Sequence, residues 1–289
     1  MSGYDHLAPA LAACGRDGFT GALRVAGTPG GTVHFRNGLV VAAESPGAPG
    51  PEALLLRSGR VSGEQWAALV RESGGAHWPA AELVAHGYAG DAQLRVVCVM
   101  ALHDAMFAIA AGRVDDCRRT TGADPFAPVE AGEPAGRLLQ DTARKLAALE
   151  ALPHPVHPDR ERPLPAQRPD GPLTPLQQEL LTRTDGRSTA RDLAFRTGRS
   201  VYAVTVEMAR MLGEGLLECA AAPEPVHIRI PTDGAGVRPR APEPPEPPPA
   251  PQALPRREPG ASGIAEVLAP ERSGTSWKWF FRLRNGTAK

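Results

Sequence analysis

Cysteine, aromatic residues and net charge are all scarce in this chain. Of its 289 residues, 4 are Cys and 5% are aromatic, and 32 Lys and Arg balance 32 Asp and Glu. A neutral chain lacks the basic field that non-specific nucleic-acid binders usually carry over the whole molecule. Glycine and proline are plentiful instead, with 31 of each. This composition indicates folded parts joined by proline-rich strings rather than one continuous core.

The cysteines do not form the pattern of a metal site or of a disulfide scaffold. They are Cys14, Cys98, Cys117 and Cys219, with no C-x-x-C and no His at ligand spacing, so we expect free, buried thiols in a reducing cytoplasm. The segment Leu11–Cys14 is similar to a lipoprotein cleavage box, but no Lys or Arg precedes it and Pro9 interrupts its short apolar stretch. The apolar run Val96–Leu102 is too short to cross a bilayer. We therefore expect a cytoplasmic protein.

Paired acidic and histidine residues offer little support for catalysis. The neighbours His103 and Asp104 lie on an expected helix, where their side chains point about 100° apart and cannot serve one site. The pair Asp115–Asp116 stands beside two arginines and is typical of a solvated strand edge. No G-x-S-x-G and no phosphate-binding glycine loop occurs in the sequence. We therefore expect no enzyme, no cofactor and no metal.

Proline divides the chain into parts. Seven of the twenty residues in 153–172 are Pro, as are ten of the twenty-one in 239–259. Because Pro fixes φ and lacks an amide proton, such stretches favour extended spacers over packed structure. The predicted fold class is α+β, with five parts: an N-terminal domain of hairpin, meander and helices (1–152), a proline-rich linker (153–172), a small winged-helix domain (173–231), a disordered proline-rich tail (232–271) and a basic aromatic segment (272–289).

The N-terminal domain is expected to open with β-structure and to continue as helices. Residues 19–26, 32–36 and 39–43 alternate or are apolar in the manner of strands. Asn37-Gly38 favours a type I′ turn between the last two, since both residues accept positive φ. Apolar spacing then predicts helices at 51–57, 63–73, 79–87, 91–111 and 134–150, with a polar strand at 113–120.

Three motifs of this domain resemble the N-terminal domain of PatA-like proteins. They are Gly18–Val25, Gly31–Ala43 and the short helix start Pro51–Leu54. The resemblance covers most of residues 10–150 and implies an accessory module of bacterial signalling. It brings no catalytic residue with it, because none is established for that family. A receiver domain would need an acidic cluster on a parallel sheet, which the sequence does not show.

The second domain has the pattern of three helices and a β-ribbon. Thr174 and Gln177 form a capping box around Pro175, and Leu193-Ala194 precede a turn glycine and Ser200 at the spacing of a helix-turn-helix. The two expected wing strands are 216–220 and 226–230. The pattern resembles bacterial helix-turn-helix regulators, among them MarR-type winged-helix proteins, and also the small helical modules appended to PatA-like domains.

The third helix of this domain has two alternative uses. Opposite its apolar stripe it carries Arg199, Tyr202, Ala203, Val206 and Arg210, which would face the major groove in a DNA-binding protein. The domain is charge-neutral, so DNA binding would need a dimer. The alternative is that the winged helix binds proteins. The leading prediction is a regulator with a DNA-binding output, and the alternative is a signalling adaptor in which both domains bind proteins.

The C-terminal segment combines aromatic and basic residues. A partner-binding role is predicted for Trp277, Trp279, Phe280, Phe281 and Arg282, which follow the proline-rich tail. Such a peptide suits a protein groove, an anionic membrane surface or nucleic acid, or it docks on its own protein. A flexible tether would raise its local concentration at a target.

Overall fold

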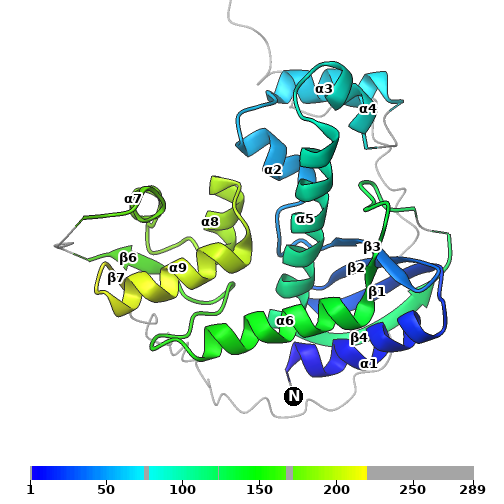
Figure 1. Ribbon diagram of the computed structural model, residues 1–289. Coiled ribbons are helices and arrows are strands. Elements are labelled where there is room, and N and C mark those ends of the chain that lie inside the picture. Colours follow the sequence, from blue (N-terminus) through cyan, green and yellow to red (C-terminus); the bar gives the residue numbers. More distant parts are fainter. Residues whose placement is uncertain (1, 75–77, 123, 167–171, 220–289) are drawn as a thin grey trace, which may run out of the picture. The chain divides into compact units, whose positions relative to one another are not determined.

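The computed structural model describes residues 2–74, 78–122, 124–166 and 172–219 (Figure 1). The chain divides into two units, residues 1–226 and 227–289. Every described residue belongs to the first unit, so the contacts given below all lie within it. The fold class is α+β with an antiparallel sheet, as the sequence predicts.

The chain begins with a helix, where the sequence analysis expected no element before the first strand. Helix α1 spans Gly3–Arg16 and starts with a capping box between Ser2 and Asp5. It contains Pro9 and buries Leu7, Leu11 and Cys14. The segment similar to a lipoprotein cleavage box is therefore part of a helix packed against β4 and α6.

A five-stranded sheet forms the core of the N-terminal part. Its strands are β1 (Gly21–Thr28), β2 (Gly31–Arg36), β3 (Leu39–Glu44), β4 (Arg113–Thr120) and β5 (Glu133–Pro134). The order is β4-β1-β2-β3-β5 and every pair is antiparallel. At the turn between β2 and β3, φ is 51° for Asn37 and 77° for Gly38, which confirms the predicted turn between two residues of positive φ.

Five further helices belong to the N-terminal part. They are α2 (Pro51–Arg57), α3 (Gly63–Glu72), α4 (Ala80–Ala85), α5 (Asp91–Ala111) and α6 (Ala135–Glu150). These bounds confirm the predicted helices to within one or two residues. The long helix α5 packs on β3, on α1 and on α6, so it is the central element of the part (Figure 1).

Helix α5 is also the one described helix that is long and apolar enough to cross a membrane by length and composition. In its most apolar window, 61% of the residues are buried inside the fold. The apolar run Val96–Leu102 was expected to be too short for a span, and it belongs to this longer helix.

Three helices follow in the second part. They are α7 (Pro175–Leu181), α8 (Ala190–Thr197) and α9 (Val201–Gly213). Gly198 joins α8 to α9 with φ of 65°, and a Cβ at this position would overlap the side chain of Arg57 at the end of α2. The position therefore requires glycine for two reasons, the left-handed conformation and the close approach of another helix.

The expected spacer 153–172 is partly packed, which corrects the prediction. Strand β6 (Pro163–Pro165) pairs antiparallel with β7 (Leu217–Cys219), and Val156 is buried. Proline is tolerated here because β6 is short and pairs along one edge only. Strand β7 lies in the expected first wing strand, whereas the second, 226–230, is outside the described residues.

The cysteines are free, but only half of them are buried. Cys14 and Cys98 lie in the core, Cys117 is half-buried and Cys219 is exposed. The expectation of four buried thiols is therefore wrong for Cys117 and Cys219, because β4 is an edge strand and β7 belongs to a two-stranded sheet.

Candidate interaction site between α5 and α9

A buried carboxylate of α5 holds the start of α9. Asp104 is 4% exposed and is the one buried acidic residue in the described part of the chain. Its Oδ2 accepts a hydrogen bond of 2.7 Å from the backbone N–H of Val201, and its Oδ1 accepts one of 3.2 Å from that of Tyr202. The two halves of the structure thus meet at a charged group that is removed from water.

The first residues of α9 need this acceptor. The first four N–H groups of a helix have no partner within the helix, and buried N–H groups without a partner are costly. The side-chain oxygen of Ser200, the N-cap residue, accepts from the N–H of Ala203 at 3.1 Å, and the same side chain is hydrogen-bonded to Asp104. Asp104 serves the two remaining N–H groups at the very start, and its negative charge also suits the positive end of the helix dipole.

An aromatic contact extends the site. The ring of Tyr202 lies edge-on to Phe107 of α5 with centroids 5.2 Å apart, and Lys145 of α6 places its Nζ 5.6 Å from the centre of the Tyr202 ring. Phe107 is fully buried. Since Asp104 and Phe107 are three positions apart, they share one face of α5, which is the face that α9 covers.

A second ionic group lies beside this contact. Asp141 of α6 accepts hydrogen bonds from His103 Nδ1 at 3.0 Å and from Lys145 Nζ at 2.9 Å. His103 therefore binds α6 while its neighbour Asp104 binds α9. The two adjacent side chains therefore contact different helices, in line with their expected divergence on α5.

The two carboxyl groups are perturbed in opposite directions. Burial raises the pKa of Asp104, and the hydrogen bonds from Val201 and Tyr202 and the charge of Lys145 only partly offset it. Partial burial would also raise the pKa of Asp141, but hydrogen bonds and charge from Lys145 and His103 outweigh it, so this pKa lies below its usual value.

The five residues predicted to face DNA do not form one free surface. Arg199 donates from Nε and Nη2 to Glu179, both at 3.2 Å, and Arg210 lies 3.8 Å from Glu207. Tyr202 and Val206 are half-buried and pack against the core, whereas Ala203 is exposed. Part of the predicted reading face therefore contacts the protein itself. The predicted partner-binding residues Trp277, Trp279, Phe280, Phe281 and Arg282 lie outside the described residues.

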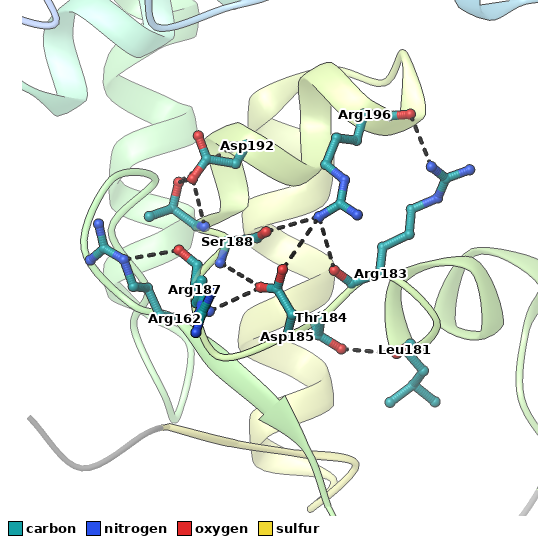
Figure 2. Close-up of polar contacts among 10 residues, drawn as sticks. Arg162, Leu181, Arg183, Thr184, Asp185, Arg187, Ser188, Asp192 and Arg196 are labelled. Carbon is teal, nitrogen blue, oxygen red and sulfur yellow. Dashed lines mark hydrogen bonds and ion pairs between the residues drawn. The ribbon is translucent and has the colours of Figure 1, made fainter. Parts of the chain in front are cut away.

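A network of polar contacts fixes the turn before α8 (Figure 2). Asp185 accepts hydrogen bonds from the backbone N–H groups of Arg187 and Ser188 at 2.9 and 2.8 Å. Arg196 donates to the Ser188 hydroxyl at 2.9 Å and lies 3.7 Å from Asp185. Arg162 binds the Arg187 carbonyl at 3.0 Å, which attaches the proline-rich segment to this turn.

The same contacts shift the pKa of the Asp185 carboxyl. The backbone hydrogen bonds from Arg187 and Ser188 lower the pKa of Asp185, and the charge of Arg196 adds to their effect. The network orders the connection between α7 and α8, which is a structural role.

The Asp115–Asp116 pair lies on β4, at the edge of the sheet. Asp115 pairs with Arg113 at 3.1 Å and Asp116 with Arg118 at 2.5 Å, all with exposed side chains. This confirms a solvated strand edge. Across the described ranges, no three His, Cys, Asp or Glu residues are grouped so that they could hold a metal ion.

Sequence reasoning placed Tyr202 and Val206 on the correct helix but missed Asp104. The available signal was a carboxylate in the middle of an apolar helical run, where an ionised group needs a specific partner. No known protein family, curated protein or solved structure matches this chain. The resemblances to PatA-like domains and to winged-helix regulators therefore stay predictions.

Proposed function

We propose that this protein is a non-enzymatic signalling adaptor of two modules. In this proposal, α7–α9 with β7 form a winged-helix module that the N-terminal module holds through Asp104. Both modules act by binding proteins, and the contact between α5 and α9 controls which surface of the second module is available. The resemblance to PatA-like domains, which implies an accessory role in bacterial signalling, agrees with such a function.

One observation supports this proposal above the others. The Asp104 carboxylate, 4% exposed, binds two backbone N–H groups of a helix 97 and 98 residues further along the chain. Burying a charge is expensive unless it is paired or hydrogen-bonded. A carboxylate that joins two modules in this way is well suited to hold one arrangement and to release α9 when the contact breaks.

DNA binding is the second candidate function. The left-handed turn at Gly198 and the capped helices α8 and α9 agree with a helix-turn-helix, and Ala203 and Arg210 have exposed side chains. In this alternative, α9 would reach DNA only after it leaves α5, because Tyr202 packs on Phe107 in the present arrangement.

A DNA-binding measurement separates the two candidates. Wild-type chain and the Asp104→Ala variant would be titrated into a labelled mixed-sequence duplex at about 50 and 200 mM salt, and fluorescence anisotropy would be followed. Asp91→Ala is the matched control, since Asp91 lies on the same helix with a 70% exposed side chain. The adaptor proposal expects no salt-dependent binding by any of the three proteins. Binding by Asp104→Ala alone would favour the DNA-binding candidate.

A second experiment tests the adaptor function positively. Full-length wild type, Asp104→Ala and Asp91→Ala would serve as baits, and the retained proteins would be compared by mass spectrometry. We expect wild type and Asp91→Ala to retain the same proteins and Asp104→Ala to retain a different set. Identical sets for all three baits would contradict a controlling role for the contact.

A further inference from the structure

A small cavity lies on the other side of α5 from the α9 contact. Its volume is about 230 Å³, it is partly open to solvent, and it is lined by the end of β3, the start of α2, the middle of α5 and residues 126–127. Its size results from small residues, since many wall positions carry no side chain beyond Cβ: Ala42, Ala43, Gly50, Ala101 and Ala127.

The floor of the cavity is apolar. Leu102 and Cys98 line it with 1% and 6% exposure, and Phe126 adds an aromatic wall. Burial raises the pKa of Cys98 to about 11, so its thiol is neutral at ordinary pH and is not a nucleophile. The floor can therefore contact the apolar part of a ligand, and no covalent chemistry is expected there.

Two glutamate residues are part of the cavity lining. Glu44 ends β3 and Glu52 lies in the first turn of α2. Glu44 is 56% exposed and has its Oε1 3.9 Å from the Nε2 of His34. None of the eleven described residues that line the cavity is Lys, Arg or His. The lining therefore combines an apolar interior with negative charge.

We propose that this cavity is a binding site for a small primary amine with a compact apolar body. Apolar cavities of about 150 Å³ already bind benzene in engineered proteins, so the volume here suits a single ring. The apolar body would displace weakly bound water, and the ammonium group would lie between Glu44 and Glu52. An anion of the same shape is disfavoured by both carboxylates. The proposal is independent of the function assigned to the α9 contact.

Three probes of similar shape test the proposal with the full-length chain. Benzylamine, benzyl alcohol and benzoate would be titrated at low salt, with dissociation constants from ligand-observed NMR. We expect benzylamine to bind about fivefold more tightly than benzyl alcohol, since exposed ion pairs contribute modestly, and benzoate to bind most weakly. Added salt should reduce the difference in affinity between benzylamine and benzyl alcohol.

Two kinds of variant locate the site. Glu52→Gln should remove most of the preference for benzylamine over benzyl alcohol, and Glu64→Gln is the matched control because Glu64 occupies the first turn of α3 and does not line the cavity. Ala127→Leu should fill the cavity and abolish binding of both ligands. Ala68→Leu, at an exposed position of α3, should change neither.

The binding measurements on the cavity-filling variants decide whether the proposed amine site stands. If Ala127→Leu fails to fold by circular dichroism, Ala101→Leu replaces it, since Ala101 lines the same cavity. Absence of saturable benzylamine binding, or unchanged binding in a folded cavity-filling variant, would overturn the site. Equal binding of benzylamine and benzoate would overturn the amine specificity.

Discussion

Helices α8 and α9 begin in different ways although they are adjacent in the chain. At α8, the Thr189 side chain accepts from the N–H of Asp192 at 3.3 Å, and the Asp192 carboxylate accepts from the N–H of Thr189 at 2.9 Å. At α9, Ser200 accepts from Ala203, and Ala203 has no side-chain acceptor to return. Asp104 of α5 accepts instead from the N–H groups of Val201 and Tyr202, the first two residues of α9.

The comparison shows which helix depends on the rest of the molecule. The capping box of α8 is complete within four residues, and the N–H of Arg191 in its first turn also binds the Pro158 carbonyl at 2.9 Å, so the start of this helix depends on the proline-rich segment but not on α5. The start of α9 is complete only while α9 lies against α5. Loss of the contact would expose α9 to fraying at its first turn and would leave α8 largely unaffected.

Removal of the carboxylate should give the largest effect. Asp104→Ala leaves two N–H groups of α9 without an acceptor in a buried position, and we expect a loss of about 3 kcal/mol in the free energy of unfolding. Urea unfolding followed by circular dichroism measures this loss. Asp91→Ala should change the same free energy by less than about 0.5 kcal/mol. Equal losses in the two variants would show that Asp104 has no special role.

Loss of the aromatic contact should have the next largest effect. Tyr202→Ala removes a half-buried ring from Phe107 and Lys145, and we expect destabilisation of about 2 kcal/mol. Tyr202→Phe keeps the ring and should cost less than about 0.5 kcal/mol, because within the described part of the chain the Tyr202 hydroxyl makes no hydrogen bond that holds the contact. Thermal unfolding of both variants checks the difference. A large loss in Tyr202→Phe would assign the effect to the hydroxyl.

The local cap of α8 should have a smaller effect. Thr189→Ala removes the side-chain acceptor of the capping box and should cost about 1 kcal/mol. Amide exchange should become faster in the first turn of α8 and stay unchanged in the first turn of α9. Faster amide exchange in the first turns of both helices would mean that the start of α9 depends on the cap of α8, which would contradict their independence.

The smallest effect concerns pH. The pKa of Asp104 is higher in the folded chain than its ordinary value of 3.8, so the folded chain binds this proton more tightly. The extra stabilisation that protonation of this carboxyl adds is therefore fully present below the ordinary pKa and is lost as pH rises through the folded pKa, while its oxygens still accept from Val201 and Tyr202. Asp104→Asn lacks this titration.

The measurement compares two proteins at two pH values. Wild type should gain stability relative to Asp104→Asn when urea unfolding is repeated at about pH 4.5 instead of about pH 7. All other titrating groups are shared by the two proteins, so their contributions to the free energy of unfolding largely cancel in the difference. A gain of the Asn variant over wild type at low pH would show that the pKa of Asp104 is lowered in the folded chain.

Local sequence patterns were sufficient to predict most of the helices and strands. The Asn37-Gly38 turn, the polar strand β4 and the capping boxes at Thr174 and Thr189 each depend on residues within a few positions. Such signals are present in a single sequence. Helix α1 also has a local signal, the capping box of Ser2 and Asp5, but Pro9 in the middle of the segment argued against a helix.

Contacts between distant residues could not be predicted in the same way. Asp104 and Val201 are 97 positions apart, and no local pattern shows that one binds the other. The pairing of β6 with β7 was missed for the same reason, since a proline-rich segment has weak strand propensity. The face of α9 was assigned by periodicity, which finds a face that differs from the apolar stripe but does not show what covers it.

Amide exchange at Val201 and Tyr202 tests the central claim most directly. These two N–H groups have no acceptor within α9, so their protection reports the Asp104 contact alone. We expect both amides to be protected in wild type and in Asp91→Ala, and to exchange about 100-fold faster or more in Asp104→Ala, as loss of a buried hydrogen bond of about 3 kcal/mol implies. Rapid exchange of both amides in the wild-type protein would contradict the claim that α5 holds α9.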